Sequence, residues 1–309
     1  MADVGRSNTH SEPQRTPTGI STMTDEELYF WDLNGYLILR NVLTKEEILA
    51  GNAAVDYFYD EIPKRKEDWG GRGANRLKGT GWMEMHGLMQ LDKPHDKPFR
   101  EMLVHPAVIS RLNVMCGKGF RLDHGPLIIS AVKGTEGLKL HGSGEPHSPL
   151  TGYHQQSGET HCNGVTVQFQ LADVDTGHGG FVCVPASHKS RYPVPEGVRT
   201  CDDDLSVVLQ PATKAGDVIF FMDGAQTHGT HPWTGNHQRR SILIKYTSKS
   251  AARGVPDPDL FQPEAWRTES ELEGMSEAER QVLMGPGVHH DGKVKPLDVD
   301  DQGNVFVVD

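Results

Sequence analysis

Residues 165–171, Val-Thr-Val-Gln-Phe-Gln-Leu, alternate apolar and polar side chains and decide the fold class. A period of two residues is typical of a β-strand with one face packed against a core. The polar face carries Gln168 and Gln170, and in a barrel that face can line the cavity. A Gly-Gly turn at 179–180 then leads into a second apolar run at 181–184. These features predict a β core.

Further strand signals lie on both sides of this pair. An Ala-Gly-Asp turn at 215–217 precedes the apolar run at 218–222, and Arg239-Arg240 opens a last apolar strand that ends at Tyr246. Another apolar run at 127–129 begins the core. The 34 glycines and 19 prolines provide many turns, which favours a β-rich fold over a helical bundle. We see no repeat and no linker, so residues 24–309 are predicted to form one domain.

The ends of the chain differ from this core. Residues 1–23 are polar and lack apolar periodicity, so we predict a disordered tail. Capping boxes at 24–27 and 44–47 predict helices over 28–33 and from there to about 60, with a strand at 36–40 between them. An amphipathic helix is predicted at 99–115, and a third capping box lies at 276–279. Residues 304–308 are predicted to add an edge strand.

Composition excludes several classes of function. The formal charge of -11 argues against binding a nucleic-acid polymer, which needs a basic surface. The four cysteines show no C-x-x-C spacing, so we expect free thiols in a reducing compartment. No run approaches the roughly 18 apolar residues of a membrane span. We therefore expect a cytoplasmic protein that acts on a small molecule, and the number of subunits stays open.

One histidine stands out among the 16 in the chain. His228 follows the buried run at 218–222, and Arg239 opens the next apolar strand eleven residues later. A histidine and an arginine near adjacent barrel strands can face one cavity. Neutral imidazole is a ligand for iron(II), and the guanidinium fork binds carboxylates in two-pronged fashion. This pair suits a metal that chelates a dicarboxylate co-substrate.

The chain resembles the phytanoyl-CoA dioxygenase family of iron(II)/2-oxoglutarate-dependent oxygenases from about residue 35 to 246. The matching segments, in order, are Leu-Ala-Asp-Val-Asp at 171–175, Gly-Gly-Phe at 179–181, Val-Pro-Ala-Ser-His-Lys at 184–189, Ala-Gly-Asp-Val at 215–218, Thr-His-Gly at 227–229, and Arg239. The resemblance implies a double-stranded β-helix, or jelly-roll, core at about 120–250 with flanking helices and a C-terminal helical extension at 251–309. It also implies iron(II), 2-oxoglutarate and O2 as cofactor and co-substrates.

The family's proximal metal motif is His-x-Asp, and this chain departs from it. The candidates are His141, His154 and His161, and none is followed by an acid two residues later. We favour His141, because it follows the first core strand after a loop as the family's proximal histidine does, and we retain His154 as the alternative. Ser143 then stands where the carboxylate belongs. A serine hydroxyl is a poor ligand for iron(II), so one coordination position is left open.

An open position has a precedent in iron/2-oxoglutarate halogenases, in which a small residue replaces the aspartate and chloride binds the iron. The resemblance to that branch is imperfect, because those enzymes have Gly or Ala where this chain has Ser143. An ordinary hydroxylase remains the alternative, with Glu145, Glu159 or Asn163 as the third ligand. A second alternative is a jelly-roll that has lost its metal and binds a small molecule.

The residues around the substrate are less sharply indicated. Gln168 is assigned to 2-oxoglutarate together with Arg239, although Arg240 competes with Arg239 because adjacent strand residues point opposite ways. Gln170 is assigned to the substrate. The Gly-rich segment 64–81 is either a solvated loop or a lid that carries Arg72, Arg76 and Lys78 toward an anionic group. Such a lid would suit a phosphate, as in the nucleotide halogenases that this chain resembles.

Overall fold

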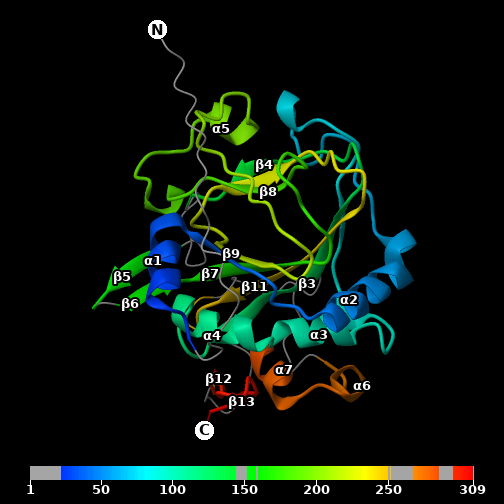
Figure 1. Cartoon of the computed structure of the whole chain (residues 1–309), viewed down its shortest axis with the longest axis vertical. Helices are drawn as coiled ribbons and strands as arrows, with labels where there is room; N and C mark the ends of the chain where they lie inside the picture. The colour runs from blue at the N-terminus through cyan, green and yellow to red at the C-terminus, as the bar shows by residue number, and fades with distance from the viewer. Residues whose placement is uncertain are drawn as a thin grey trace.

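Two antiparallel β-sheets face one another in a computed structural model that describes residues 22–143, 152–157, 159–249, 251, 267–284 and 295–308. The larger sheet has the order β1 (Tyr36–Leu39), β9 (Val218–Met222), β7 (Gly164–Gln170), β11 (Arg239–Thr247), β3 (Arg121–Ala131) and β2 (Met83–Met85). The smaller sheet has the order β4 (Leu138–His141), β10 (His228–His231) and β8 (Gly180–Cys183). In Figure 1 the smaller sheet lies above the larger one.

Helices cover the outer face of the larger sheet (Figure 1). They are α1 (Asp25–Asn34), α2 (Lys45–Phe58), α3 (Lys97–Leu103) and α4 (Pro106–Met115). The short helices α6 (Glu269–Leu272) and α7 (Glu277–Val282) lie below α3 in this view, and α5 (Glu196–Thr200) lies beside the smaller sheet. Short 3-10 turns occur at Tyr59–Glu61, Asn75–Leu77, Leu88–Gln90 and Ser187–Lys189. No described helix has both the length and the apolar character that crossing a membrane requires.

The predicted capping boxes are confirmed at three helices. Thr24, Thr44 and Ser276 each accept a hydrogen bond from the amide three residues later, and that residue's carboxylate accepts one from the cap amide. The single helix predicted at 99–115 is wrong, because Pro106 begins a new helix there. Proline lacks the amide that would continue the first helix, and the His105 side chain accepts from the Ala107 amide instead.

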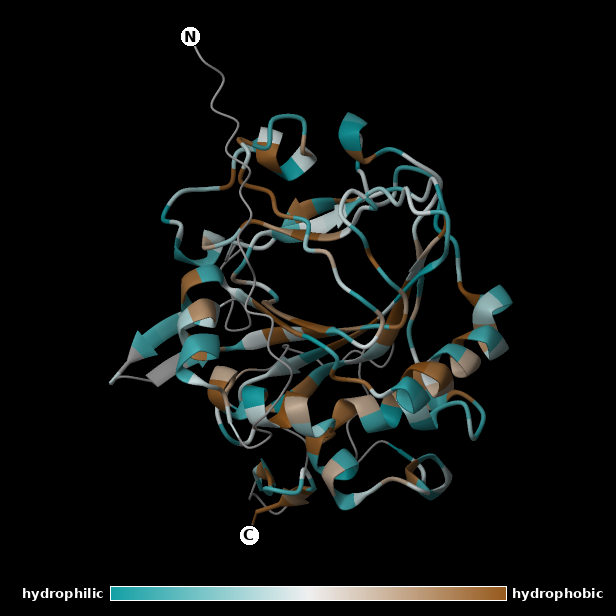
Figure 2. Cartoon of the chain, in the orientation of Figure 1, coloured by the Kyte–Doolittle hydropathy of each residue, from teal (hydrophilic) through white to brown (hydrophobic). Residues whose placement is uncertain are grey.

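The two faces of the larger sheet have different roles. On β7, Val165, Val167 and Phe169 point into the main core, on the side of the sheet that α3 and α4 cover. Thr166, Gln168 and Gln170 alternate with them and therefore point toward the smaller sheet. All seven residues of β7 are buried, so these polar side chains lie in the interior and not in solvent. In Figure 2 hydrophobic residues follow the strands of the larger sheet, whereas the rim loops are mostly hydrophilic.

Several features outside the two sheets differ from the predictions. The C-terminal strand β13 (Val305–Val307) pairs with β12 (Leu297–Val299) as a separate hairpin and adds no edge to the core. The predicted disordered tail lies outside the described residues except for its end, where Met23 is buried in the main core. β5 (Tyr153–Gln156) and β6 (Glu159–Cys162) form a hairpin that projects from the molecule (Figure 1). The four cysteines are unpaired, as predicted, and all four are buried.

Candidate metal and co-substrate site

His141 and His228 face each other between the two sheets. They are register partners on the antiparallel strands β4 and β10, and their ring centroids lie 4.3 Å apart. The ring of His228 also contacts Phe221 of β9 at 4.7 Å, so it points across the gap toward the larger sheet. The two histidines are 87 residues apart in the sequence (228 minus 141), and strand pairing alone brings them together.

The hydrogen bonds of both rings leave the same nitrogen free. The Nδ1 atom of His141 lies 3.0 Å from the Lys139 carbonyl, and that of His228 lies 2.9 Å from the Gln226 carbonyl. A carbonyl only accepts, so Nδ1 carries the proton in both rings and Nε2 keeps its lone pair. This is the tautomer that a metal-binding histidine needs. The pair therefore fits a divalent metal ion.

The environment favours neutral imidazole at both positions. Burial, reinforced by the charge of the adjacent His141, lowers the pKa of His228 to about 3. Desolvation likewise lowers the pKa of His141. A metal ligand must be unprotonated, so these shifts keep the pair ready to bind at acidic pH, where an ordinary histidine would be charged.

The same shift predicts acid sensitivity of the metal-free protein. The pKa of histidine in an unfolded chain is about 6.5, whereas burial lowers the pKa of folded His228 to about 3. Between these values the unfolded chain binds a proton that the folded chain excludes, so the free energy of unfolding falls as the pH drops through this window. Urea unfolding at about pH 7.5 and about pH 5 measures the change, which should be smaller in His228→Gln. An unchanged pH dependence in this variant would contradict the assignment.

Ser143 lies beside the histidine pair and brings no carboxylate. Its φ is 67°, and its hydroxyl is in very close contact with the hydroxyl of Thr227, the residue before His228. The described residues contain no group of three or more His, Cys, Asp or Glu side chains that could hold a metal ion. Asn163 bonds through its side-chain oxygen to Ser248, 3.0 Å away. Glu145 and the side chain of Glu159 lie outside the described residues.

Arg239 is a buried cation without an acidic partner in the described part of the chain. Its Nε donates to the Ser241 hydroxyl at 3.1 Å, and that hydroxyl donates to the Gln170 side-chain oxygen at 2.8 Å. Burial lowers the pKa of Arg239 to about 10, so the guanidinium stays charged at neutral pH. Gly180 packs against it, and a Cβ at this glycine would lie 3.3 Å from Nε. A buried charge of this kind fits the carboxylate of a bound co-substrate.

Arg240 points to the opposite face, as alternation requires. Its guanidinium donates to Asn52 at 2.9 Å and to Asp56 at 2.6 Å, both on α2. Arg240 therefore joins the sheet to a helix, whereas Arg239 faces the interior. Gln168 also faces the interior, and its buried side-chain amide nitrogen has no hydrogen-bond partner in the described residues. Gln170 accepts the hydrogen bond of the Ser241 hydroxyl that contacts Arg239, and its assignment to the substrate stays a prediction.

A cluster of polar side chains near the histidines was missed in the sequence. Asp223, just after β9, accepts from the Thr166 hydroxyl at 2.8 Å and pairs with the Lys245 ammonium at 2.9 Å. The sequence does hold one signal for it, because Lys245 interrupts the apolar run of β11. Asp223 and Lys245 could not be recognised as partners from their spacing, because Lys245 lies on β11 whereas Asp223 follows the end of β9.

Several other predicted residues lie away from the histidine pair. His154 stacks on His161 in the β5–β6 hairpin, at 5.0 Å between centroids. Arg76 lies beside the outer face of the smaller sheet, where it lines a cavity of about 380 Å³ with His231 and Asp204. Lys78 is exposed. Arg72 is exposed too, although its charge contributes to the lowered pKa of His141. The segment 64–81 does not bring the three cations together.

Comparisons with known proteins agree with the fold. The model of the phytanoyl-CoA dioxygenase (PhyH) family matches residues 31–241. HygX from Streptomyces hygroscopicus, solved with nickel and 2-oxoglutarate, is 16% identical, with a TM-score of 0.61 over 81% of this chain and 94% of HygX. The non-heme alpha-ketoglutarate-dependent carbocyclase SnoK from nogalamycin biosynthesis is 20% identical, with a TM-score of 0.58 over 79% and 92%. The predicted jelly-roll core is thus confirmed. No curated protein sequence matches the chain.

Proposed function

The chain belongs to the phytanoyl-CoA dioxygenase family of iron(II)/2-oxoglutarate-dependent enzymes, and within this family we propose that it is a halogenase of small molecules. It replaces a hydrogen on an aliphatic carbon of its substrate by chlorine. The overall reaction consumes the substrate, chloride, one proton, O2 and 2-oxoglutarate, and it yields the chlorinated product, water, succinate and carbon dioxide. Bound iron and 2-oxoglutarate supply the oxidant that removes the hydrogen.

The protein's own residues divide into two groups in this proposal. His141 and His228 hold the iron through Nε2, because Nδ1 of each ring is committed to a backbone carbonyl. Arg239 binds the distal carboxylate of 2-oxoglutarate, with Ser241 fixing the guanidinium. Gln168 faces the same interior and can donate its unpaired amide hydrogens to the co-substrate. We assign no role to Arg240, whose guanidinium is occupied on the outer face.

The observation that carries the halogenase proposal is the residue two places after His141. Ser143 offers only a hydroxyl, which is already in contact with Thr227, and no described acid completes the set. The coordination position that a carboxylate would take is then left to an exogenous ligand. A hydroxylase is the competing outcome, and it requires a third ligand from the protein.

The substrate is proposed to be a small molecule of secondary metabolism. HygX has been solved with hygromycin B bound, and SnoK comes from nogalamycin biosynthesis. SnoN, an epimerase from the same pathway, shares the fold at 17% identity and a TM-score of 0.53. These proteins do different chemistry on one fold, so the substrate of this chain depends on its own site residues and not on the fold.

A carboxylate restored at position 143 is expected to abolish chloride binding at the metal. In wild type the visible charge-transfer band of the anaerobic iron(II)–2-oxoglutarate complex should shift as chloride is added. In Ser143→Asp the new carboxylate takes the open position, so the band should not respond to chloride, and iron(II) should bind at least about tenfold more tightly.

Ser143→Ala is the matched control, because it removes the hydroxyl without adding a ligand. Its band should respond to chloride as in wild type. A wild-type band that ignores chloride would mean that a protein ligand fills the position, and it would favour the hydroxylase. No band in any variant would contradict metal-dependent function altogether.

A further inference from the structure

Thr166, Asp223 and Lys245 form a polar cluster on the inner face of the larger sheet. Asp223 accepts a hydrogen bond from the Thr166 hydroxyl at 2.8 Å. Its two carboxylate oxygens lie 2.9 and 3.2 Å from the Lys245 ammonium. The Lys245 and Asp223 side chains keep 24% and 22% of their surface exposed. The ion pair is therefore held on the inner face of the larger sheet, and one side of it is accessible to a ligand.

Strand register places this cluster opposite the histidine pair. Thr166 of β7 pairs with Phe221 of β9 on one side and with Lys245 of β11 on the other. These three side chains form one row across the sheet, because register partners point to the same face. The ring of His228 contacts Phe221 at the end of this row. After desolvation, which lowers the pKa of both histidines, the charge of Lys245 lowers each pKa further and the charge of Asp223 raises it, as expected for close neighbours.

The cluster offers complementary hydrogen-bonding groups side by side. An ammonium has three donors, and Asp223 does not occupy them all. The Asp223 carboxylate has further lone pairs beyond those that accept from Thr166 and Lys245. A ligand anion would gain from Lys245 but be repelled by Asp223, and a ligand cation would meet the reverse. A hydroxyl group escapes this conflict, because it accepts from the ammonium and donates to the carboxylate. Two adjacent hydroxyls can engage both residues at once.

We propose that Asp223 and Lys245 bind adjacent hydroxyl groups of the substrate and hold the target carbon beside His141 and His228. The substrate class is thus a neutral, polyhydroxylated molecule or moiety. This inference rests on the proposed function for what happens to the substrate, but the binding itself does not depend on halogenation. It also replaces the phosphate expected from Arg72, Arg76 and Lys78, since Arg76 lines a different cavity on the outer face of the smaller sheet.

Four cyclohexane derivatives test the chemical class at constant shape. The probes are the vicinal cyclohexanediol, cyclohexanol, cyclohexanecarboxylate and cyclohexylamine, and binding to the metal-free protein is followed by saturation-transfer NMR. Every protein in this series carries Arg239→Leu, so that the guanidinium assigned to 2-oxoglutarate cannot bind the carboxylate probe, and wild type here means wild type at positions 223 and 245. In wild type the diol should give the lowest dissociation constant. It should bind about fivefold more tightly than cyclohexanol, because the second hydroxyl adds one hydrogen bond. The carboxylate and the amine should bind most weakly.

Charge-changing variants should move the preference in opposite directions. Asp223→Asn leaves Lys245 without its partner, so the variant should lose the diol and gain the carboxylate by about fivefold each. Lys245→Gln leaves the carboxylate alone, so it should lose the diol and gain the amine. The double variant Asp223→Asn/Lys245→Gln carries neither charge and should prefer none of the four probes. The double variant also tests the role of the ion pair if one of the single variants does not fold.

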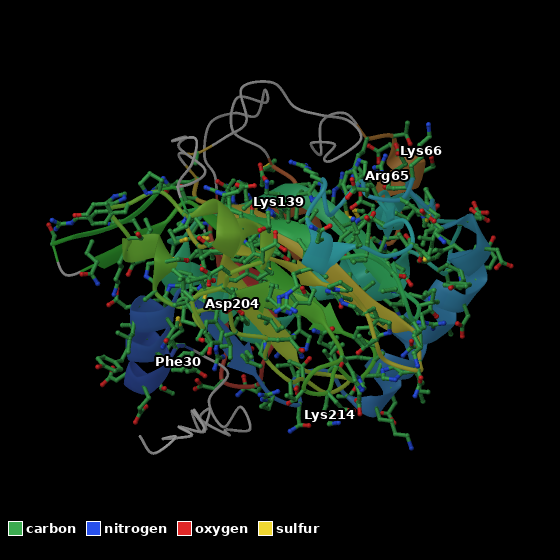
Figure 3. All side chains as sticks on the ribbon, turned by 90° about the horizontal axis from the view of Figure 1, so that it is seen from above. Phe30, Arg65, Lys66, Lys139, Asp204 and Lys214 are labelled. Atoms are coloured by element: carbon green, nitrogen blue, oxygen red, sulfur yellow. The ribbon has the colours of Figure 1, made fainter. Side chains whose placement is uncertain are left out.

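Lys214→Gln is the matched control. Lys214 is an exposed lysine that also pairs with carboxylates, those of Asp173 and Asp175, and it lies at the edge of the molecule in the view from above (Figure 3). This variant should bind the probes like wild type. A wild-type preference for the carboxylate would overturn the proposal in favour of an anion site. Equal probe binding by wild type and all variants would show that the ion pair is only structural.

The outcome is independent of the proposed reaction. No iron, 2-oxoglutarate or chloride is present in these measurements, so diol binding through the pair stands whether or not the Ser143→Asp comparison supports a halogenase. Conversely, a chloride-responsive metal complex combined with no preference for the diol would remove this substrate class and leave the proposed function intact.

Discussion

Alanine at position 228 is expected to abolish iron(II) binding at concentrations where wild type is saturated. His228 and His141 pack ring against ring between the sheets, 4.3 Å apart by ring centroids, and the Nδ1 atom of each is bonded to a backbone carbonyl, which leaves Nε2 free. Loss of one ligand from a site with so few protein ligands should raise the dissociation constant more than about 100-fold, since even outer contacts to a ligand are worth 10- to 100-fold. Anaerobic equilibrium dialysis with iron(II) measures the loss without any need for a substrate.

His231→Ala is the control for this variant, because it lies on the same strand. His231 is three residues after His228, so its side chain points to the opposite face of the strand, where it lines the outer cavity. It should bind iron(II) like wild type. His154→Ala should also be unaffected, since His154 lies in the projecting β5–β6 hairpin. Loss of iron in His154→Ala with retention in His141→Ala would overturn our choice of the first ligand.

Leucine at position 239 is expected to prevent 2-oxoglutarate from binding. Arg239 is a buried guanidinium with no acidic partner in the described part of the protein, so a bound carboxylate would supply its counter-charge. Truncating one side of a buried charge pair costs about 2–5 kcal/mol, which corresponds to an increase in dissociation constant of about 30-fold or more. Titration of the iron-loaded, anaerobic protein with 2-oxoglutarate measures it.

Arg240→Leu separates this role from a general effect of losing an arginine. Its contacts with Asn52 and Asp56 tie β11 to α2, so the variant should bind 2-oxoglutarate normally but unfold at lower urea. Arg239→Leu should bind 2-oxoglutarate poorly but unfold at a higher urea concentration than wild type. The reason for the second effect is that the ligand-free protein loses a buried charge that has no ion-pair partner. Impaired 2-oxoglutarate binding in Arg240→Leu alone would contradict the assignment of the inward arginine.

The alternating pattern predicted more of this structure than any single motif. It identified β7 and placed Gln168 and Gln170 on one face, which points toward the smaller sheet, because a period of two leaves little choice once the other face is buried. The helix starts were also predictable, since a capping box is a local arrangement of four residues. Pro106 broke the predicted long helix for an equally local reason, which the apolar pattern across it had concealed.

Long-range pairing explains what the sequence left open. Spacing gave three candidates for the first histidine, and only the register of β4 against β10 places one of them, His141, against His228. Lys245 stood out in an apolar strand, but its partner Asp223 lies 22 residues away beyond a different strand. Arg76 fell on the outer side of the smaller sheet for the same reason. A loop's composition does not determine which face of a distant sheet it covers.

The most direct test of the account is the ligand set of the iron itself. X-ray absorption at the iron edge, on the anaerobic 2-oxoglutarate complex in bromide, detects a heavy halide bound to the metal, and Ser143→Asp serves as the comparison. The account predicts bromide in the first coordination shell of wild type and none in Ser143→Asp. A wild-type spectrum without bromide, and with an oxygen ligand from the protein in its place, would contradict it.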